Sequence, residues 1–132
     1  METKPLILVC DDNKSISQLI VFVLQKAGYR SQAVGTALDC VALARRSKPD
    51  VILMDIVMPG MDGATASGLM KDIPELVGTP IVLLSAMPQE QVKDRLEDTD
   101  VKGYLTKPFR IGDVLDLVKH CLSLRPALKP AV

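Results

Sequence analysis

Three short apolar runs, each ending at a polar side chain, constrain the fold of this chain more than any other feature. The clearest is Val51–Met54, which stops at the carboxylate of Asp55. Apolar runs this short cannot form helices of ordinary length, and they suit strands that are buried on both faces. The other two runs are Leu6–Cys10, which stops at Asp11-Asp12, and Pro80–Leu84, which stops at Ser85.

Between the strands, apolar residues recur at the spacing of helices. Five helices are predicted, over about residues 13–28, 36–48, 63–72, 88–98 and 111–122. In the second helix the residues at helical spacing are Leu38, Val41, Ala42 and Arg45, and in the third the residues on one face are Ala66, Leu69, Met70 and Ile73. The fourth helix offers only Val92 and Leu96 as an apolar pair, so it is expected to be the least firmly held.

Two further strands, Tyr29–Val34 and Val101–Thr106, are more polar than the first three. Polar strands belong at the edges of a sheet, which the strand order 2-1-3-4-5 provides. Strands that alternate with helices form parallel sheets with right-handed crossovers. The prediction is therefore an α/β fold of the flavodoxin-like (βα)5 type, a doubly wound parallel five-stranded sheet. Residues 1–122 are expected to form the domain and 123–132 a flexible C-terminal tail.

Composition excludes several classes of function. The chain has 132 residues with 16 Lys plus Arg and 16 Asp plus Glu, so it has none of the basic surplus of a nucleic-acid binder. It has no apolar stretch of about eighteen residues and no secretory leader, which indicates a cytoplasmic protein without a membrane span. The three cysteines, Cys10, Cys40 and Cys121, are expected to be buried reduced thiols.

Polar side chains follow four of the five predicted strands. Since the carboxyl ends of parallel strands meet at one edge, these side chains should converge on one shallow pocket. Three carboxylates close together repel one another unless a cation is present, and a few hard oxygen ligands suit Mg²⁺. Lys107 adds a positive charge, Ser85 adds a hydroxyl donor, and Asp55 is the natural nucleophile for an aspartyl-phosphate. The converging residues are Asp11, Asp12, Asp55, Ser85 and Lys107.

These residues resemble the motifs of the receiver domain of two-component response regulators, in its stand-alone form similar to the chemotaxis regulators. Asp55 lies within Met-Asp-Ile-Val-Met-Pro-Gly-Met-Asp-Gly, which is similar to the family's phosphoacceptor motif. The remaining motifs are the acidic pair Asp11-Asp12, the hydroxyl-plus-alanine pair Ser85-Ala86, the aromatic Tyr104 and the triplet Lys107-Pro108-Phe109. The resemblance covers about residues 4–122.

The resemblance implies a role for each matched residue. Asp55 would be phosphorylated, and Mg²⁺ would be held by Asp11, Asp12, Asp55 and the backbone carbonyl of Val57. Ser85, Ala86 and Lys107 would bind the phosphoryl group, and the Lys107–Pro108 peptide bond would be cis. Ser85 and Tyr104 would form the switch, and Val57 and Met87 would tune the lifetime of the phosphorylated state.

The resemblance also implies partners. The phosphoryl donor would be a sensor histidine kinase or a phosphotransfer protein, and the signal would pass to an output protein, with the chain as a monomer or a phosphorylation-dependent dimer. No nucleic acid or membrane is expected as a partner. The expected partner surfaces are an exposed Phe22 for the kinase, and Val92, Leu96 and Tyr104 for output.

Two alternatives stay open at the level of sequence. A receiver-like adaptor would bind partners without phosphorylation, although every phosphorylation residue is present. A small Mg²⁺-dependent phosphatase would also use an aspartyl-phosphate, but such enzymes typically carry Asp-x-Asp where this chain has Asp55-Ile56-Val57. The chain is therefore not expected to be an enzyme beyond its own Mg²⁺-assisted phosphorylation and dephosphorylation. It departs from the family pattern at Asp98–Val101, which lacks a small Gly/Ala pair, and in having apolar residues at Val57 and Met87.

Overall fold

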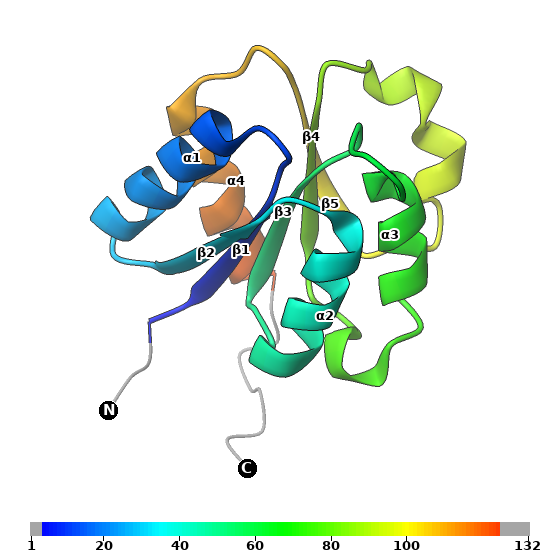
Figure 1. The fold of residues 1–132 in the computed structure, drawn as a ribbon, viewed down its shortest axis with the longest axis horizontal. Coiled ribbons are helices and arrows are strands. Elements are labelled where there is room, and N and C mark those ends of the chain that lie inside the picture. The colour runs from blue at the N-terminus through cyan, green and yellow to red at the C-terminus, as the bar shows by residue number, and fades with distance from the viewer. Residues whose placement is uncertain (1–3, 125–132) are drawn as a thin grey trace.

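Strands and helices alternate along residues 4–124, the part of the chain that the computed structural model describes (Figure 1). The strands are β1 (Leu6–Cys10), β2 (Arg30–Val34), β3 (Val51–Asp55), β4 (Ile81–Ser85) and β5 (Val101–Thr106). The helices are α1 (Lys14–Lys26), α2 (Ala37–Ser47), α3 (Gly63–Met70) and α4 (Ile111–Ser123). Most of the predicted tail, residues 125–132, lies outside the described residues.

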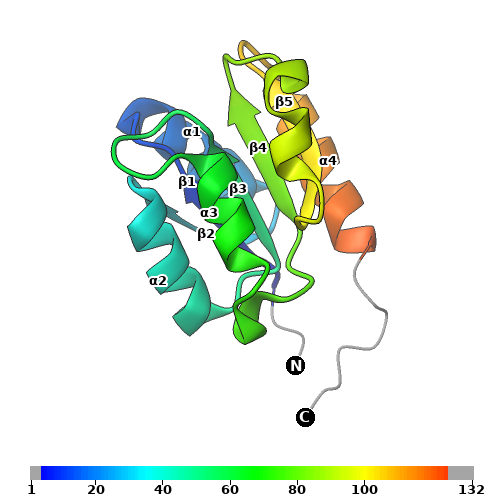
Figure 2. The same cartoon turned by 90° about the vertical axis from the view of Figure 1, so that its right-hand side faces the viewer.

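All five strands are parallel and follow the order β2-β1-β3-β4-β5, which confirms the predicted flavodoxin-like sheet. Helices α1 and α4 cover one face and α2 and α3 the other (Figures 1 and 2). The central strands contribute alternate side chains to the two faces, so Ile7 and Val9 pack against α1 while Leu8 and Cys10 pack against α2. This burial on both faces explains why β1, β3 and β4 are apolar throughout.

Side-chain caps determine where three of the helices begin. Asn13 accepts a hydrogen bond from the Ile16 N–H, Thr36 from the Asp39 N–H, and Asp62 from the Thr65 N–H. Each cap satisfies a backbone donor that has no partner inside its helix, which typically stabilises a protein by about 1 kcal/mol. Helices α1 and α2 therefore begin within a few residues of the preceding strands, whereas α3 begins after the loop of residues 56–62.

The prediction of a helix over residues 88–98, between β4 and β5, is wrong. Residues 88–98 form two short 3₁₀ turns instead, η2 (Gln89–Gln91) and η3 (Lys93–Leu96). Two apolar residues are too few to hold an amphipathic helix on the sheet. The segment is attached instead through the buried Val92 and through Arg95, whose guanidinium bonds the α3 residues Asp62 and Thr65. Arg95 is thus an anchoring residue.

In α2 the buried residues differ from those picked out by helical spacing, and in α3 one residue of the predicted face is exposed. In α2 the fully buried residues are Ala37, Cys40 and Ala44, whereas Leu38 is 66% exposed and Ala42 and Arg45 are exposed. In α3 Ala66 and Met70 are buried as predicted and Ile73 packs partly buried against the core, whereas Leu69 is exposed. Small residues beside Met70 also face the sheet. Small side chains let a helix approach the strands closely, so here residue size decided which face is buried more than hydrophobicity did.

The three cysteines are free thiols and are buried, as the sequence predicts. A hydrogen bond from the Cys10 thiol to the neighbouring Cys40, together with burial, raises the pKa of the Cys10 thiol far above its ordinary value. Such a thiol is not reactive at neutral pH. No helix within residues 4–124 is long and apolar enough to cross a membrane.

Candidate functional site

The Asp55 carboxylate lies at the carboxyl end of β3 and is 6% exposed. Its Oδ1 accepts a hydrogen bond from the Val57 N–H at 3.1 Å, which turns the chain away from the strand. The loop then returns so closely that the Gly63 N–H donates to the Ile56 carbonyl at 2.9 Å. A Cβ at Gly63 would lie 2.3 Å from the Asp55 carbonyl oxygen, so only glycine fits there. The start of α3 and the position of Asp55 are therefore coupled.

The acidic residues at the end of β1 lie beside Asp55. Asp11 is buried and its Oδ1 accepts a hydrogen bond from the Asn13 N–H at 2.9 Å, while Asp12 is exposed. One carboxylate oxygen from each of Asp11, Asp12 and Asp55 lies within 4.8 Å of the others. Such a set of carboxylate oxygens, open to solvent on one side, fits a hard divalent cation that keeps several water ligands.

Lys107 connects two of these carboxylates. Its Nζ donates to Asp11 Oδ2 at 3.1 Å and to Asp55 Oδ2 at 3.0 Å. The Lys107 N–H donates to the Ser85 carbonyl at 2.7 Å, and the Lys107–Pro108 peptide bond is cis, the form expected from the sequence. The end of β4 thus holds the lysine backbone while its side chain reaches across β3 to β1.

Burial and the charge of the partner group have opposite effects on the pKa values of Asp55 and Lys107. Burial raises the pKa of Asp55, and the nearby Asp11 raises it further, so this pKa stays above its ordinary value even though Lys107 lowers it. Burial by itself lowers the pKa of Lys107, but its hydrogen bonds and charge interactions with Asp55 and Asp11 outweigh this, and its pKa is raised. At neutral pH the lysine therefore remains charged and partly neutralises the carboxylates.

Ser85 and Tyr104 meet at the Met87 backbone. The buried Ser85 Oγ accepts a hydrogen bond from the Met87 N–H at 3.1 Å, and the Tyr104 hydroxyl donates to the Met87 carbonyl. Burial raises the pKa of Tyr104, with a smaller opposite effect from the Ser85 hydroxyl. Ala86 lies between these groups and is exposed. The loop after β4 is thus held in one conformation by both residues that the sequence predicts as the switch.

The remaining predicted residues lie in different surroundings. Val57 is 60% exposed and Met87 is half-buried. They lie two residues after Asp55 and Ser85, in the loops that follow β3 and β4. Phe22 is 57% exposed, as expected for a surface residue. Val92 was expected at a partner surface, but its side chain is only 2% exposed and packs in the core. Leu96 and Tyr104 are partly buried against the same core.

The link between Arg95 and Asp62 is the feature that sequence reasoning missed. Arg95 Nη2 donates to both carboxylate oxygens of Asp62, at 3.0 and 3.1 Å, and to Thr65 Oγ1 at 3.0 Å. It joins η3 to the first turn of α3, directly after the loop that carries Asp55. The aspartate could be recognised as a helix cap from the sequence, but nothing local indicated that its partner lies about thirty residues away.

A parallel five-stranded α/β sheet with a carboxylate cluster and a bridging lysine at its carboxyl edge is the arrangement that the resemblance to receiver domains predicts. The family model of the response regulator receiver domain matches residues 7–119. The chain therefore belongs to this family, whose members act in two-component signal transduction and are generally not enzymes.

The chain is similar to several known response regulators. It is 36% identical over 117 residues to protein PilH of Pseudomonas aeruginosa, a match that covers 89% of this chain and 97% of PilH. It is 34% identical over 118 residues to the DNA-binding dual master transcriptional regulator RpaA of a Synechocystis species, a match that covers 89% of this chain. That match covers 49% of RpaA, so this chain spans about half the length of that relative.

Solved structures show the same fold. The chemotaxis response regulator CheY4 of Vibrio cholerae superposes with a TM-score of 0.84 at 28% identity, covering 91% of this chain and 100% of that one. The receiver domain of the sensor histidine kinase PA1611 from Pseudomonas aeruginosa gives 0.82 at 26% identity, covering 92% and 99%. That structure has a magnesium ion coordinated in its active-site cleft.

Proposed function

We propose that this chain is a phosphorylation-driven switch in which Asp55 receives a phosphoryl group from a phosphohistidine on a histidine kinase or phosphotransfer protein. The observation that carries the proposal is the bridge from Lys107 Nζ to Asp55 Oδ2 and Asp11 Oδ2, at 3.0 and 3.1 Å. A lysine held by two buried carboxylates beside a third is an arrangement that receives and neutralises additional negative charge.

Each residue of the site has its own role in the transfer of the phosphoryl group. An oxygen of Asp55 forms a bond to phosphorus as the bond from phosphorus to the donor nitrogen breaks, and the electron pair of that bond stays on the nitrogen. Lys107 neutralises the phosphoryl oxygens, and the Ser85 hydroxyl and Ala86 N–H donate hydrogen bonds to them. Mg²⁺, held by the acidic cluster and the Val57 carbonyl, would supply further positive charge to these oxygens.

The switch would begin at Ser85. The new phosphoryl group adds roughly −1.5 to −2 charges and three acceptor oxygens. The Ser85 oxygen now accepts a hydrogen bond from the Met87 N–H. After phosphorylation the Ser85 hydroxyl would donate to the charged phosphoryl oxygens, and such a charge-assisted bond is the stronger one. Movement of this loop would displace the Met87 carbonyl that Tyr104 now bonds, and free the ring to move. The signal would reach an output protein through the surface around Tyr104 and Leu96.

A groove beside the site offers a docking surface for the phosphodonor. It has a volume of about 470 Å³ and lies directly beside Lys107-Pro108. Its lining is mostly apolar and comes from α1, the loop between β5 and α4, and the first residue of α4, with Ile16, Leu19 and Phe109 among its residues. The exposed Phe22 lies one helical turn beyond Leu19 and would extend this surface. The free buried thiols agree with a role in the cytoplasm.

Incubation of the full chain with Mg²⁺ and acetyl phosphate, followed by intact-mass measurement, tests the proposal. One phosphoryl adduct is expected, and Asp55→Asn should abolish it while leaving the circular dichroism spectrum unchanged. No adduct on the unmodified chain would favour the adaptor that works without phosphorylation. Turnover of free phosphate esters without an accumulating adduct would favour the phosphatase.

A further inference from the structure

The two edges of the sheet differ in their protection against further pairing. At the β5 edge, the register with β4 is irregular between Ile81 and Val82, and the exposed Lys102 lies within the strand. Irregular register and lysine are the features by which edge strands resist pairing with another chain. Strand β2 pairs with β1 in continuous register, and its only charged residue is Arg30, at its first position. The β2 edge is therefore unguarded.

The backbone of β2 presents pairing groups on its outer side. The Arg30 N–H donates to the Pro5 carbonyl at 2.9 Å and the Val34 carbonyl accepts from the Asp11 N–H at 3.1 Å, so these two residues face β1. In a parallel ladder alternate residues face the same neighbour, and the N–H and C=O groups of Ser31 and Ala33 therefore face outward. Within residues 4–124 no other strand lies along this side of β2.

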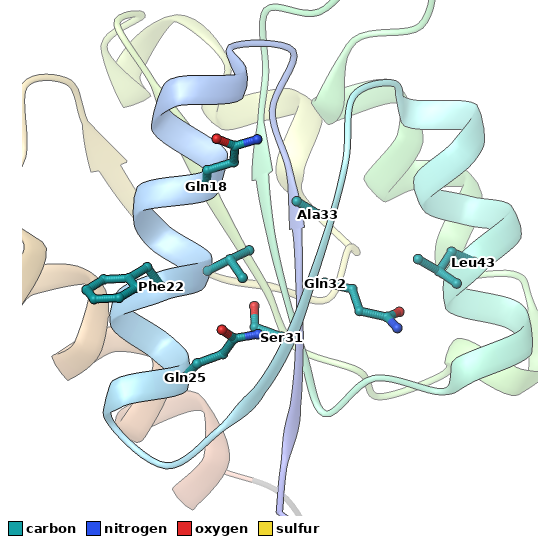
Figure 3. Close-up of a pocket in the computed structure, with 8 residues that line it drawn as sticks. Gln18, Phe22, Gln25, Ser31, Gln32, Ala33 and Leu43 are labelled. Carbon is teal, nitrogen blue, oxygen red and sulfur yellow. The ribbon is translucent and has the colours of Figure 1, made fainter.

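A groove of about 640 Å³ follows this edge, with α1 on one side of β2 and α2 on the other (Figure 3). None of the residues that line it is charged. This matters for self-association, because a two-fold interface places each surface against its own copy, and like charges would then repel. Its apolar walls come from Val21 and Phe22 of α1 and Leu43 of α2, and its polar side chains include Gln18, Gln25 and Gln32.

We propose that two copies of this chain associate through their β2 strands, paired antiparallel about a two-fold axis at Gln32. Ser31 of each copy then pairs with Ala33 of the other, and each pair exchanges both N–H···O=C hydrogen bonds. The two Gln32 amides lie opposite each other, and an amide is both donor and acceptor. Arg30 lies opposite Val34 of the second copy, which keeps the two guanidinium groups apart.

The association does not depend on phosphorylation. The paired groups belong to β2 and its flanking helices, whereas Asp55 and Lys107 lie at the carboxyl edge of the sheet. In an antiparallel pair the carboxyl edges of the two sheets point in opposite directions, so both acidic sites stay open. Phe22 lines the dimer groove, so in the dimer the phosphodonor would dock on the groove beside Lys107 without it. The proposal of a dimer therefore does not depend on the proposed phosphoacceptor function of Asp55.

Sedimentation velocity of the unphosphorylated full chain at rising concentration tests the proposal. Gln32→Lys places two lysines opposite each other and should raise the dimer dissociation constant about tenfold or more, and Gln32→Glu should do the same. An equimolar mixture of these two variants should recover association, because lysine then faces glutamate. Gln91→Lys, the same change at an exposed position in η2, is the matched control and should leave the constant unchanged.

Several outcomes would overturn the β2 dimer. One is a chain that stays monomeric at every concentration. Another is a dimer that Gln32→Lys leaves intact, or one that the mixture of lysine and glutamate variants fails to restore. A dimer that forms only after incubation with Mg²⁺ and acetyl phosphate would instead depend on phosphorylation, which also contradicts the proposal. Urea unfolding of each variant confirms that a lost dimer does not reflect a lost fold.

Discussion

Replacing Gly63 with alanine tests the coupling between α3 and the acidic site most directly. A Cβ at this position would lie 2.3 Å from the Asp55 carbonyl oxygen, 3.0 Å from its carbon and 3.1 Å from the Ile56 Cα. All three atoms belong to the backbone, so no side chain can rotate away to make room. Either the loop carrying Asp55 or the first turn of α3 must move.

The expected cost follows from this geometry. Overpacking a well-packed site typically costs about 1–3 kcal/mol, and a clash with backbone places Gly63→Ala near the upper limit. The better helix propensity of alanine returns at most about 1 kcal/mol. We therefore expect a loss of about 2–3 kcal/mol in the free energy of unfolding. We also expect slower phosphorylation by acetyl phosphate, because the carboxylate of Asp55 is displaced.

Gly68→Ala is the matched control, because it makes the same change in the same helix. A Cβ at Gly68 meets nothing within 4 Å, so this variant should gain about 0.5–1 kcal/mol from helix propensity. Urea unfolding of both variants, with comparable m-values, gives the comparison. If Gly63→Ala is as stable as Gly68→Ala and is phosphorylated at the rate of the unmodified chain, the start of α3 is not coupled to the position of Asp55.

Three further predictions concern the lifetime, the metal and the loop after β4. Val57 and Met87 cannot position a water by a strong hydrogen bond, and general-base assistance is worth about 10²–10⁴ in rate, so Val57→Asn and Met87→Glu should each lose phosphate faster than the unmodified chain. Equal rates of phosphate loss, followed by intact mass in Mg²⁺, would refute shielding by these residues. Because burial raises the pKa of Asp55, protons compete for it at a higher pH than for an ordinary aspartate, and Mg²⁺ affinity should fall as the pH is lowered through that raised pKa. Calorimetric titrations at several pH values check this, and an affinity that falls only in the ordinary aspartate range would contradict it. Arg95→Ala should cost only about 0.5–1 kcal/mol, because the ion pair is largely exposed, but amide exchange should accelerate across residues 89–96. Unchanged exchange in that segment would show that Arg95 does not anchor it.

Much of the fold could be predicted because the informative patterns are local. The apolar runs that became β1, β3 and β4 end at Asp11, Asp55 and Ser85, and parallel pairing brings those ends together whatever the details of packing. The polar residues of β2 and β5 are also a local pattern, and they predict edge positions because an edge strand is less buried than a central one. The proximity of the carboxylates follows from topology, and the topology follows from alternation of strands and helices along the chain.

Only the tertiary structure decided which helix faces are buried and which structure residues 88–98 adopt in place of the predicted helix. Leu38 is exposed and Cys40 is buried because the fit of α2 against the sheet favours small side chains, which a spacing pattern does not report. Val92 became a core residue and Arg95 an anchor on Asp62 through contacts between segments about thirty residues apart. Local pattern sets strands and their ends, whereas packing and long-range hydrogen bonds depend on shapes that form only when the chain has folded.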